Sequence, residues 1–221
     1  EEGVCYREAL KLRIDYPEAH NNLAAVLRAQ GRQGEAAEHY REALRLRPAY
    51  PEAHYNYALL LDANDSAVGA AERYRQALTL RPEYVDAHHG YANFLKAHGD
   101  LAAAEQHYLE VLRLRPRYAE VLNDYAILLE DRGLGEQARD RYEQALAISP
   151  DFAEAHYNFA ILLENLGDAV DTERHYREAI RIWPRYAEAH NNLAILLQAQ
   201  GDRDGAERHF REALALRPND P

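Results

Sequence analysis

Sulfur is scarce in this sequence, whose 221 residues include one cysteine, Cys5, and no methionine. A single cysteine excludes an intramolecular disulfide, and a lone thiol fits a reducing compartment better than an oxidising one. The cytoplasm is therefore favoured, although the sequence leaves the compartment undecided. The chain begins Glu1-Glu2 without an initiating methionine, so we expect it to be part of a longer protein.

Lysine and long apolar runs are also scarce. Lys11 and Lys96 are the only lysines, and the formal net charge is −11 with a pI near 5.5. Proteins that bind nucleic-acid backbones carry clustered basic residues, so this balance argues against nucleic acid and favours a neutral or basic protein or peptide ligand. No apolar run approaches the ~20 residues that span a bilayer, so membrane insertion is not expected.

Motifs of catalysis and metal binding are absent. The sequence has no HExxH or Cys-x-x-Cys pattern, no glycine-rich phosphate loop and no G-x-S-x-G elbow. Most of the eleven histidines fall in two repeated columns, and a residue that repeats with the fold usually serves packing or the helix surface. His88 and His89 are the exception, because adjacent helical residues point in different directions and one of them can face a ligand. We expect no catalytic residue, no metal site and no cofactor.

What the sequence does contain is an internal repeat of 34 residues. The period is marked by six prolines that keep the same spacing: Pro48, Pro82, Pro116, Pro150, Pro184 and Pro218. It divides residues 1–221 into a half unit, 1–16, and six full units: 17–50, 51–84, 85–118, 119–152, 153–186 and 187–220.

Each unit has the pattern of two amphipathic helices, with apolar residues at helical spacing. A glycine such as Gly31 separates the two helices and supplies a left-handed residue, and Asp65 takes this place once. Proline ends the second helix because it cannot continue it. N-caps of the second helix are predicted at four positions: Ser66, Asp100, Asp168 and Asp202.

Two columns explain how the helices pack. Alanine allows the axes of two helices to approach closely, and it occupies one repeat position in all six units: Ala24, Ala58, Ala92, Ala126, Ala160 and Ala194. Aromatic rings fill the next gap: Tyr40, Tyr74, Tyr108, Tyr142, Tyr176 and Phe210. Burying one such ring stabilises by about 1.5 to 3 kcal/mol, so a unit is marginal alone and stable when stacked on its neighbours.

These residues resemble the tetratricopeptide (TPR) repeat family over essentially the whole chain. The resemblance implies an all-α fold, a right-handed TPR solenoid of stacked antiparallel helix pairs, as a single domain over residues 1–221. Six full repeats would follow one extra helix in residues 1–13. The chain departs from the family in two columns. Histidine or Leu122 stands where the family often has tryptophan, and alanine stands where the family often has glycine.

The resemblance also implies that the first helix of each unit lines a concave groove, with its second, fifth, sixth, ninth and twelfth positions meeting the ligand. The sixth column is rich in asparagine: Asn22, Asn56, Asn158 and Asn192, interrupted by Gly90 and Asp124. Carboxamides can hold the backbone of an extended peptide, and this column looks like the asparagine ladder in the TPR superhelix of O-GlcNAc transferase-type proteins. Alternatively, the asparagines bond to neighbouring helices. The other predicted groove residues are Asn21, Tyr55, His89, Asn93, Asn123, Tyr157 and Asn191.

The second column is acidic in every unit: Glu18, Glu52, Asp86, Glu120, Glu154 and Glu188. Acids in a first turn suit the helix dipole as well as a basic ligand. The cationic clamp by which family members bind acidic chaperone tails is absent, so such tails are excluded.

The sequence thus predicts a non-enzymatic scaffold that binds a polypeptide with micromolar or weaker affinity. One alternative is a module that stacks end to end through exposed apolar ends as a homo-oligomer, and another is the substrate-recruiting TPR part of a glycosyltransferase-like enzyme. Protonating all eleven histidines would roughly cancel the net charge, so self-association is expected between about pH 5 and 6.

Overall fold

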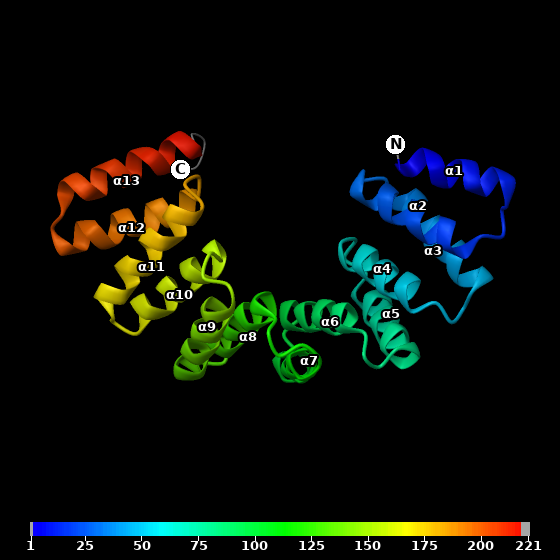
Figure 1. The fold of residues 1–221 in the computed structure, drawn as a ribbon, viewed down its shortest axis with the longest axis horizontal. Helices are drawn as coiled ribbons and strands as arrows, with labels where there is room; N and C mark the ends of the chain where they lie inside the picture. The colour runs from blue at the N-terminus through cyan, green and yellow to red at the C-terminus, as the bar shows by residue number, and fades with distance from the viewer. Residues whose placement is uncertain (1, 218–221) are drawn as a thin grey trace. The chain divides into compact units, whose positions relative to one another are not determined.

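The computed structural model describes residues 2–217, which form thirteen α-helices and no strand (Figure 1). The predicted all-α class is confirmed. The helices are α1 (Glu2–Leu12), α2 (Pro17–Ala29), α3 (Gln33–Leu46), α4 (Pro51–Asp62), α5 (Ala67–Leu80), α6 (Val85–Ala97), α7 (Leu101–Leu114), α8 (Ala119–Asp131), α9 (Gly135–Ile148), α10 (Ala153–Asn165), α11 (Ala169–Ile182), α12 (Ala187–Gln200) and α13 (Arg203–Leu216).

The helices follow the 34-residue frame. Each first helix, from α2 to α12, begins at the first residue of a repeat, and its second helix follows after a short turn. Pro17 and Pro51 occupy the first turns of α2 and α4, where the missing N–H leaves no helical hydrogen bond unmade. The extra helix predicted over residues 1–13 is α1, which packs on α2.

The turn between the two helices of a repeat requires a left-handed residue. Gly31 has a φ of 74° and Gly201 a φ of 88°, and the turns at 99, 133 and 167 have the same geometry. Asp65 adopts a φ of 56° and is the one described non-glycine residue with positive φ. A Cβ in this region crowds the following carbonyl, so Asp65 carries strain that its glycine counterparts avoid.

Replacing Asp65 with glycine is therefore expected to raise the free energy of unfolding by about 0.5 to 1 kcal/mol. Asp131→Gly provides the control, because that aspartate lies in the last turn of α8, where glycine costs up to about 1 kcal/mol. Urea denaturation of both variants measures the difference. A loss of stability in Asp65→Gly would show that the aspartate side chain contributes more than the strain it carries.

At the start of the second helix, the three predicted aspartates make a side-chain cap hydrogen bond and the predicted serine does not. Asp202 accepts a hydrogen bond from the Gly205 N–H at 2.9 Å, Asp100 accepts from Ala103 at 3.1 Å, and Asp168 also caps its helix. Ser66 makes no side-chain cap hydrogen bond, so the prediction of a cap there is wrong. Serine is long enough to cap a helix, so the missing hydrogen bond at Ser66 reflects the geometry of this turn and not the residue type.

The core repeats with the sequence. The alanine column is 0% exposed at each of its six positions, and the tyrosine column is at most 1% exposed from Tyr40 to Tyr176. Thr172, which replaces a small alanine, is also fully buried, and its hydroxyl donates to the Asp168 carbonyl at 2.7 Å. That hydrogen bond satisfies the one polar atom that the substitution brings into the core.

The helices gather into two compact units, which divide between Leu114 and Arg115. Unit 1 contains α1 to α7 and unit 2 contains α8 to α13. The sequence predicts a single solenoid over residues 1–221, and nothing in the 34-residue frame marks this division. Continuity of one solenoid across it stays a prediction. Each helix in residues 2–217 is too short or too polar to cross a membrane.

Candidate functional site

The asparagines of unit 1 are joined by hydrogen bonds across two repeats. The Asn56 Nδ2 group of α4 donates to the Asn21 Oδ1 atom of α2 at 3.1 Å. Asn21 in turn donates from its Nδ2 group to the Asn22 Oδ1 atom, also at 3.1 Å. Asn21 is only 4% exposed, so it links the two repeats and has little surface to offer a ligand.

Unit 2 repeats this arrangement. Asn158 donates to the Asn123 Oδ1 atom at 3.1 Å, and Asn123 donates to Asp124 at 3.4 Å. Asn123 is 1% exposed and has the linking role of Asn21. In the last repeat the Nδ2 group of Asn192 donates to the Tyr157 hydroxyl at 3.2 Å. The sixth residue of one first helix therefore bonds to the fifth residue of the preceding one.

Gly90 interrupts the asparagine column beside two tyrosine rings. A Cβ atom built at this residue would lie 3.1 Å from Cε2 of Tyr55 and 3.3 Å from Cε1 of Tyr74. A side chain there would therefore require one of these rings to shift slightly. The equivalent rings in unit 2, Tyr157 and Tyr176, do accommodate an asparagine, because Asn192 donates to the Tyr157 hydroxyl.

The column asparagines keep hydrogen-bonding capacity after these contacts. A carboxamide has two N–H donors and one oxygen acceptor, and Asn56 and Asn158 each use one donor within the described residues. Both side chains are partly exposed. The contact to the preceding repeat fixes the orientation of the carboxamide and leaves its oxygen and second N–H available, so the structural and ligand-binding interpretations are compatible.

The remaining predicted groove residues fall into different environments. Asn93 accepts a hydrogen bond from the buried Tyr108 hydroxyl and lies 3.4 Å from the His89 Nε2 atom. Tyr55 packs its ring against Tyr84, with ring centroids 5.4 Å apart. Asn191, by contrast, is exposed on α12.

Arginines neutralise half of the acidic column. Glu18 pairs with Arg47, and the hydrogen bond from that guanidinium lowers the pKa of the Glu18 carboxyl. The same ion pair, between residues 29 apart, joins Glu52 to Arg81 and Glu188 to Arg217. Sequence reasoning missed these pairs, although the arginine before the proline repeats in the same frame and signals them.

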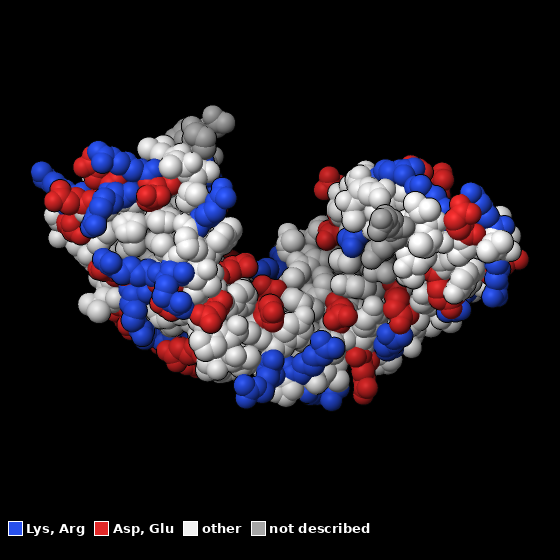
Figure 2. Space-filling model, turned by 45° about the horizontal axis from the view of Figure 1, so that its top comes forward, with Lys and Arg blue, Asp and Glu red and all other residues white. Residues whose placement is uncertain are grey.

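The other three acids of the column, Asp86, Glu120 and Glu154, are exposed and make no ion pair with a described residue. At Glu120 and Glu154 the sequence gives a reason, because Ser149 and Trp183 stand where the other repeats have arginine. On the face that Figure 2 shows, basic and acidic side chains are interspersed. The acidic column is thus a row of ion pairs in some repeats and free charge in others.

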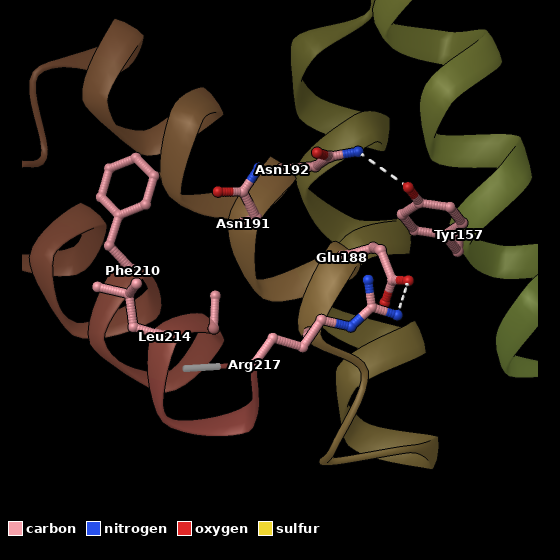
Figure 3. Close-up of a pocket in the computed structure, with 9 residues that line it drawn as sticks. Tyr157, Glu188, Asn191, Asn192, Phe210, Leu214 and Arg217 are labelled. Atoms are coloured by element: carbon pink, nitrogen blue, oxygen red, sulfur yellow. Dashed lines mark hydrogen bonds and ion pairs between the residues drawn. The ribbon is translucent and has the colours of Figure 1, made fainter. Parts of the chain in front are cut away.

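A cavity of about 440 Å³ lies between α12 and α13 in unit 2 (Figure 3). Asn191 and Asn192 on α12 lie across it from Phe210 and Leu214 on α13. Its rim holds the Glu188–Arg217 pair and Tyr157 of α10, which receives the Asn192 hydrogen bond. The cavity combines carboxamides on one wall with apolar side chains on the other.

Aromatic rings continue from this cavity into unit 2. The Tyr157 ring lies 6.0 Å from that of Tyr176 and 4.8 Å from that of Tyr186, measured between centroids. Tyr186 in turn packs on Trp183 at 4.6 Å, and the indole is 51% exposed at the end of α11. Trp183 thus packs at a turn.

The two histidine columns meet in pairs inside the repeats. The Nδ1 atoms of His156 and His175 lie 2.8 Å apart, and the His156 Nε2 atom lies 3.0 Å from the Pro150 carbonyl oxygen. Only an Nε2–H can bond to that carbonyl, so in the neutral state the Nδ1 atom of His156 accepts and that of His175 donates. Three further pairs have the same geometry: His20 with His39, His88 with His107, and His190 with His209.

Burial disfavours protonation of these pairs. It lowers the pKa of His107 and of His175 to about 4 from the ordinary 6.5, and the facing histidine adds to the shift. The pKa values of His54 and His156 are also lowered by burial. These four histidines therefore bind protons at a lower pH than an ordinary histidine, so they contribute less to the charge change expected between pH 5 and 6.

Comparison with protein families gives three matches, all to tetratricopeptide models. A tetratricopeptide repeat model matches residues 151–219, a TPR repeat model matches residues 26–64 and 131–167, and another tetratricopeptide repeat model matches residues 59–119. No curated protein sequence matches the chain.

Solved structures with the same fold are numerous. The structure of PilF from Pseudomonas aeruginosa is 21% identical, with a TM-score of 0.81 over 92% of this chain and 93% of that one. Cut9, from the Cut9–Hcn1 hetero-tetramer of APC/C, is 14% identical with a TM-score of 0.80, and this chain covers 97% of its own length but 43% of Cut9. YrrB, described as a TPR protein with an unusual peptide-binding site, is 19% identical with a TM-score of 0.62 over 83% of this chain and 94% of that one. At these identities the likeness concerns the fold alone.

Proposed function

The chain is a tetratricopeptide repeat protein, and from that premise we propose that it is a scaffold whose first helices bind an extended segment of another polypeptide. The fold is typical of protein interaction. The observation that carries the proposal is the set of partly exposed carboxamides whose orientation is fixed by the preceding repeat. Asn56 and Asn158 each present an oxygen and an N–H at equivalent places of their repeats.

An extended peptide needs this combination of groups. Its backbone offers N–H donors and carbonyl acceptors that alternate along the chain, and a carboxamide can bond to either. Because the contact is made with the backbone, the side chains of the ligand contribute little to selection. The resemblance of the column to that of O-GlcNAc transferase-type proteins stays a prediction, as does the recruitment of a substrate for a catalytic domain.

The charge of the ligand follows from the state of the acidic column. Glu18, Glu52 and Glu188 are already paired with arginine, so a basic side chain would have to displace a guanidinium there. Glu120 and Glu154 have no such partner. We therefore propose a largely neutral segment whose occasional Lys or Arg contacts the repeats at 119–152 and 153–186.

The test compares peptides with and without backbone N–H groups. Asn56→Ala and Asn158→Ala should each weaken binding of peptides selected from an array by about 2- to 10-fold, because one net hydrogen bond contributes about 0.5 to 1.5 kcal/mol. N-methylation of the peptide backbone should weaken binding of the wild type by a similar factor. Asn64→Ala and Asn165→Ala are the matched controls, since both asparagines are exposed outside the column.

Equal binding by the column variants and the controls would refute a backbone-reading site. Circular dichroism of each variant verifies that its helix content is intact. If alanine substitutions in the peptide abolish binding while N-methylation does not, the ligand is selected by its side chains.

A further inference from the structure

In unit 1 the end of a second helix holds an arginine beside an acid and an aromatic ring. Arg47 pairs with Glu18, and its guanidinium carbon lies 4.9 Å from the centroid of the Tyr50 ring. One repeat later, Arg81 pairs with Glu52, and its guanidinium carbon lies 4.8 Å from a tyrosine ring centroid. A carboxylate and the face of an aromatic ring both attract a cation, so each repeat has a guanidinium site that the chain fills with its own arginine.

The repeat at 153–186 has the acid and the ring without the arginine. Trp183 stands at the arginine position, and its ring centroid lies 4.6 Å from that of Tyr186, close to the distance of the guanidinium from its tyrosine in unit 1. The indole is 51% exposed. Glu154, the acid of this repeat, is exposed and makes no ion pair with a described residue. Its charge therefore stays uncompensated beside an aromatic surface.

Glu154 lies close to the ring on which the indole packs. Burial and the nearby Tyr157 raise the pKa of the Tyr186 hydroxyl, and the Glu154 carboxylate raises it further. The next repeat shows the filled arrangement, in which Glu188 pairs with Arg217 in the wall of the cavity that Tyr157 also lines (Figure 3). The site has a described repeat on each side, so its open charge does not result from where the described chain ends.

The other two unpaired acids of the column lack such a surface. Ser149 stands at the arginine position opposite Glu120 and supplies no ring. Asp86 has an arginine at that position, Arg115, whose guanidinium lies over a tyrosine ring. Among the acids of this column, all of which the structure describes, the one in the repeat at 153–186 alone combines an unpaired charge with an exposed indole.

We propose that Glu154 and Trp183 form the binding site for an arginine side chain of the bound polypeptide. The inference rests on the proposed function, since this arginine belongs to the extended segment that the first helices bind. Its guanidinium lies on the exposed indole and pairs with the Glu154 carboxylate. Arginine fits better than lysine, because its planar group stacks on a ring and offers a carboxylate two parallel N–H donors. Asn158 lies one turn further along α10 and contacts the ligand backbone beside this arginine.

The test uses three fluorescein-labelled peptides that differ in one side chain. Alternating alanine and serine residues flank a central arginine, lysine or citrulline, and citrulline has the shape of arginine without its charge. In fluorescence anisotropy, the wild type should bind the arginine peptide about 5- to 20-fold more tightly than the citrulline peptide, because the ring contact and the exposed ion pair each contribute modestly. The lysine peptide should bind with intermediate affinity.

Three variants locate this preference for arginine over citrulline. Trp183→Arg gives the repeat the arginine of its neighbours, which should pair with Glu154 and reduce the preference to less than about twofold. Glu154→Gln should reduce it about two- to fivefold. Glu120→Gln is the matched control, because it removes an unpaired acid that has no indole beside it, and it should leave the preference unchanged. The replaced side chains are exposed, so the variants should fold, as circular dichroism verifies.

Two measurements separate this site from the extended-peptide site. Asn158→Ala should weaken binding of all three peptides and leave the ratio of arginine to citrulline binding unchanged. If no peptide binds, the extended-peptide site is refuted, and the emission of the single indole tests the arginine site alone. N-acetylarginine amide should change that emission at lower concentration in the wild type than in Glu154→Gln, and N-acetylcitrulline amide should affect both proteins equally.

Three results would overturn the arginine site. One is equal binding of the arginine and citrulline peptides by the wild type. Another is a preference for arginine that survives Trp183→Arg or is lowered as much by Glu120→Gln as by Glu154→Gln. The third is a change of indole emission by N-acetylarginine amide that is the same in the wild type and in Glu154→Gln.

Discussion

Replacing Tyr142 with alanine is expected to lower the free energy of unfolding by about 3 to 5 kcal/mol, the range for removing a large aromatic side chain from a core. Tyr142 is fully buried in α9, and its ring stacks on Phe159 of α10 with centroids 5.5 Å apart. The substitution leaves a cavity between two repeats, so it weakens the contact on which a marginal repeat depends. Urea denaturation followed by circular dichroism measures the loss.

Two phenylalanine variants separate the ring from its hydroxyl. Tyr142 donates to the Glu130 carboxylate at 2.5 Å, and burial raises the pKa of that carboxyl. Tyr142→Phe should therefore cost about 1 to 3 kcal/mol, since it removes the donor from a half-buried acid. In Tyr40→Phe little loss is expected, because the Tyr40 hydroxyl is buried and makes no hydrogen bond with a described residue. A loss for Tyr142→Ala no larger than that for Tyr142→Phe would contradict the role of the ring.

The folded state is expected to lose stability steadily as the pH falls from 7 to 4. The folded-state pKa values of His107 and His175 are about 4, below the ordinary 6.5, so the unfolded chain binds protons first. The stability that these histidines contribute is complete above pH 6.5 and is lost progressively down to about pH 4. A second cause acts in the same direction, because a proton on the Nδ1 atom of His156 would face the N–H of His175.

The repeat at 119–152 supplies the matched control for this acid sensitivity. It has Leu122 and Arg141 where the other repeats have histidine pairs or His54 with Arg73. The double variant His156→Leu, His175→Arg copies this combination and should have a shallower dependence of the urea midpoint on pH. An unchanged slope would mean that the acid sensitivity arises outside the pairs.

Much of the fold follows from local signals in the sequence. Proline and the left-handed turn residues mark helix ends directly, so even the irregular Asp65 could be predicted in its conformation. The buried columns follow from periodicity alone, because the same side chains meet in every repeat. Ser66 was mispredicted because its residue type permits a cap without ensuring its geometry.

The candidate site was harder to predict, because its contacts join residues far apart in the chain. Asn21 and Asn123 have polar side chains at positions expected to face a ligand, yet both are buried as acceptors for residues 35 positions later. The pairing of Glu18 with Arg47 likewise depends on where the end of α3 meets the start of α2. Composition gives the charge of each group, and only the packing shows which charges cancel.

The ring contacts that end at Trp183 make its indole an acceptor of excitation energy from the neighbouring tyrosines. Light absorbed by Tyr176 can pass through Tyr157 and Tyr186 to the indole, because neighbouring centroids in this series are no more than 6.0 Å apart. Transfer from tyrosine to tryptophan falls steeply with distance, so the contribution of Tyr157, which lies on α10, decreases when α10 separates from α11 and the start of α12. The single indole of the chain therefore reports, by its sensitised emission, whether the repeats around it are folded.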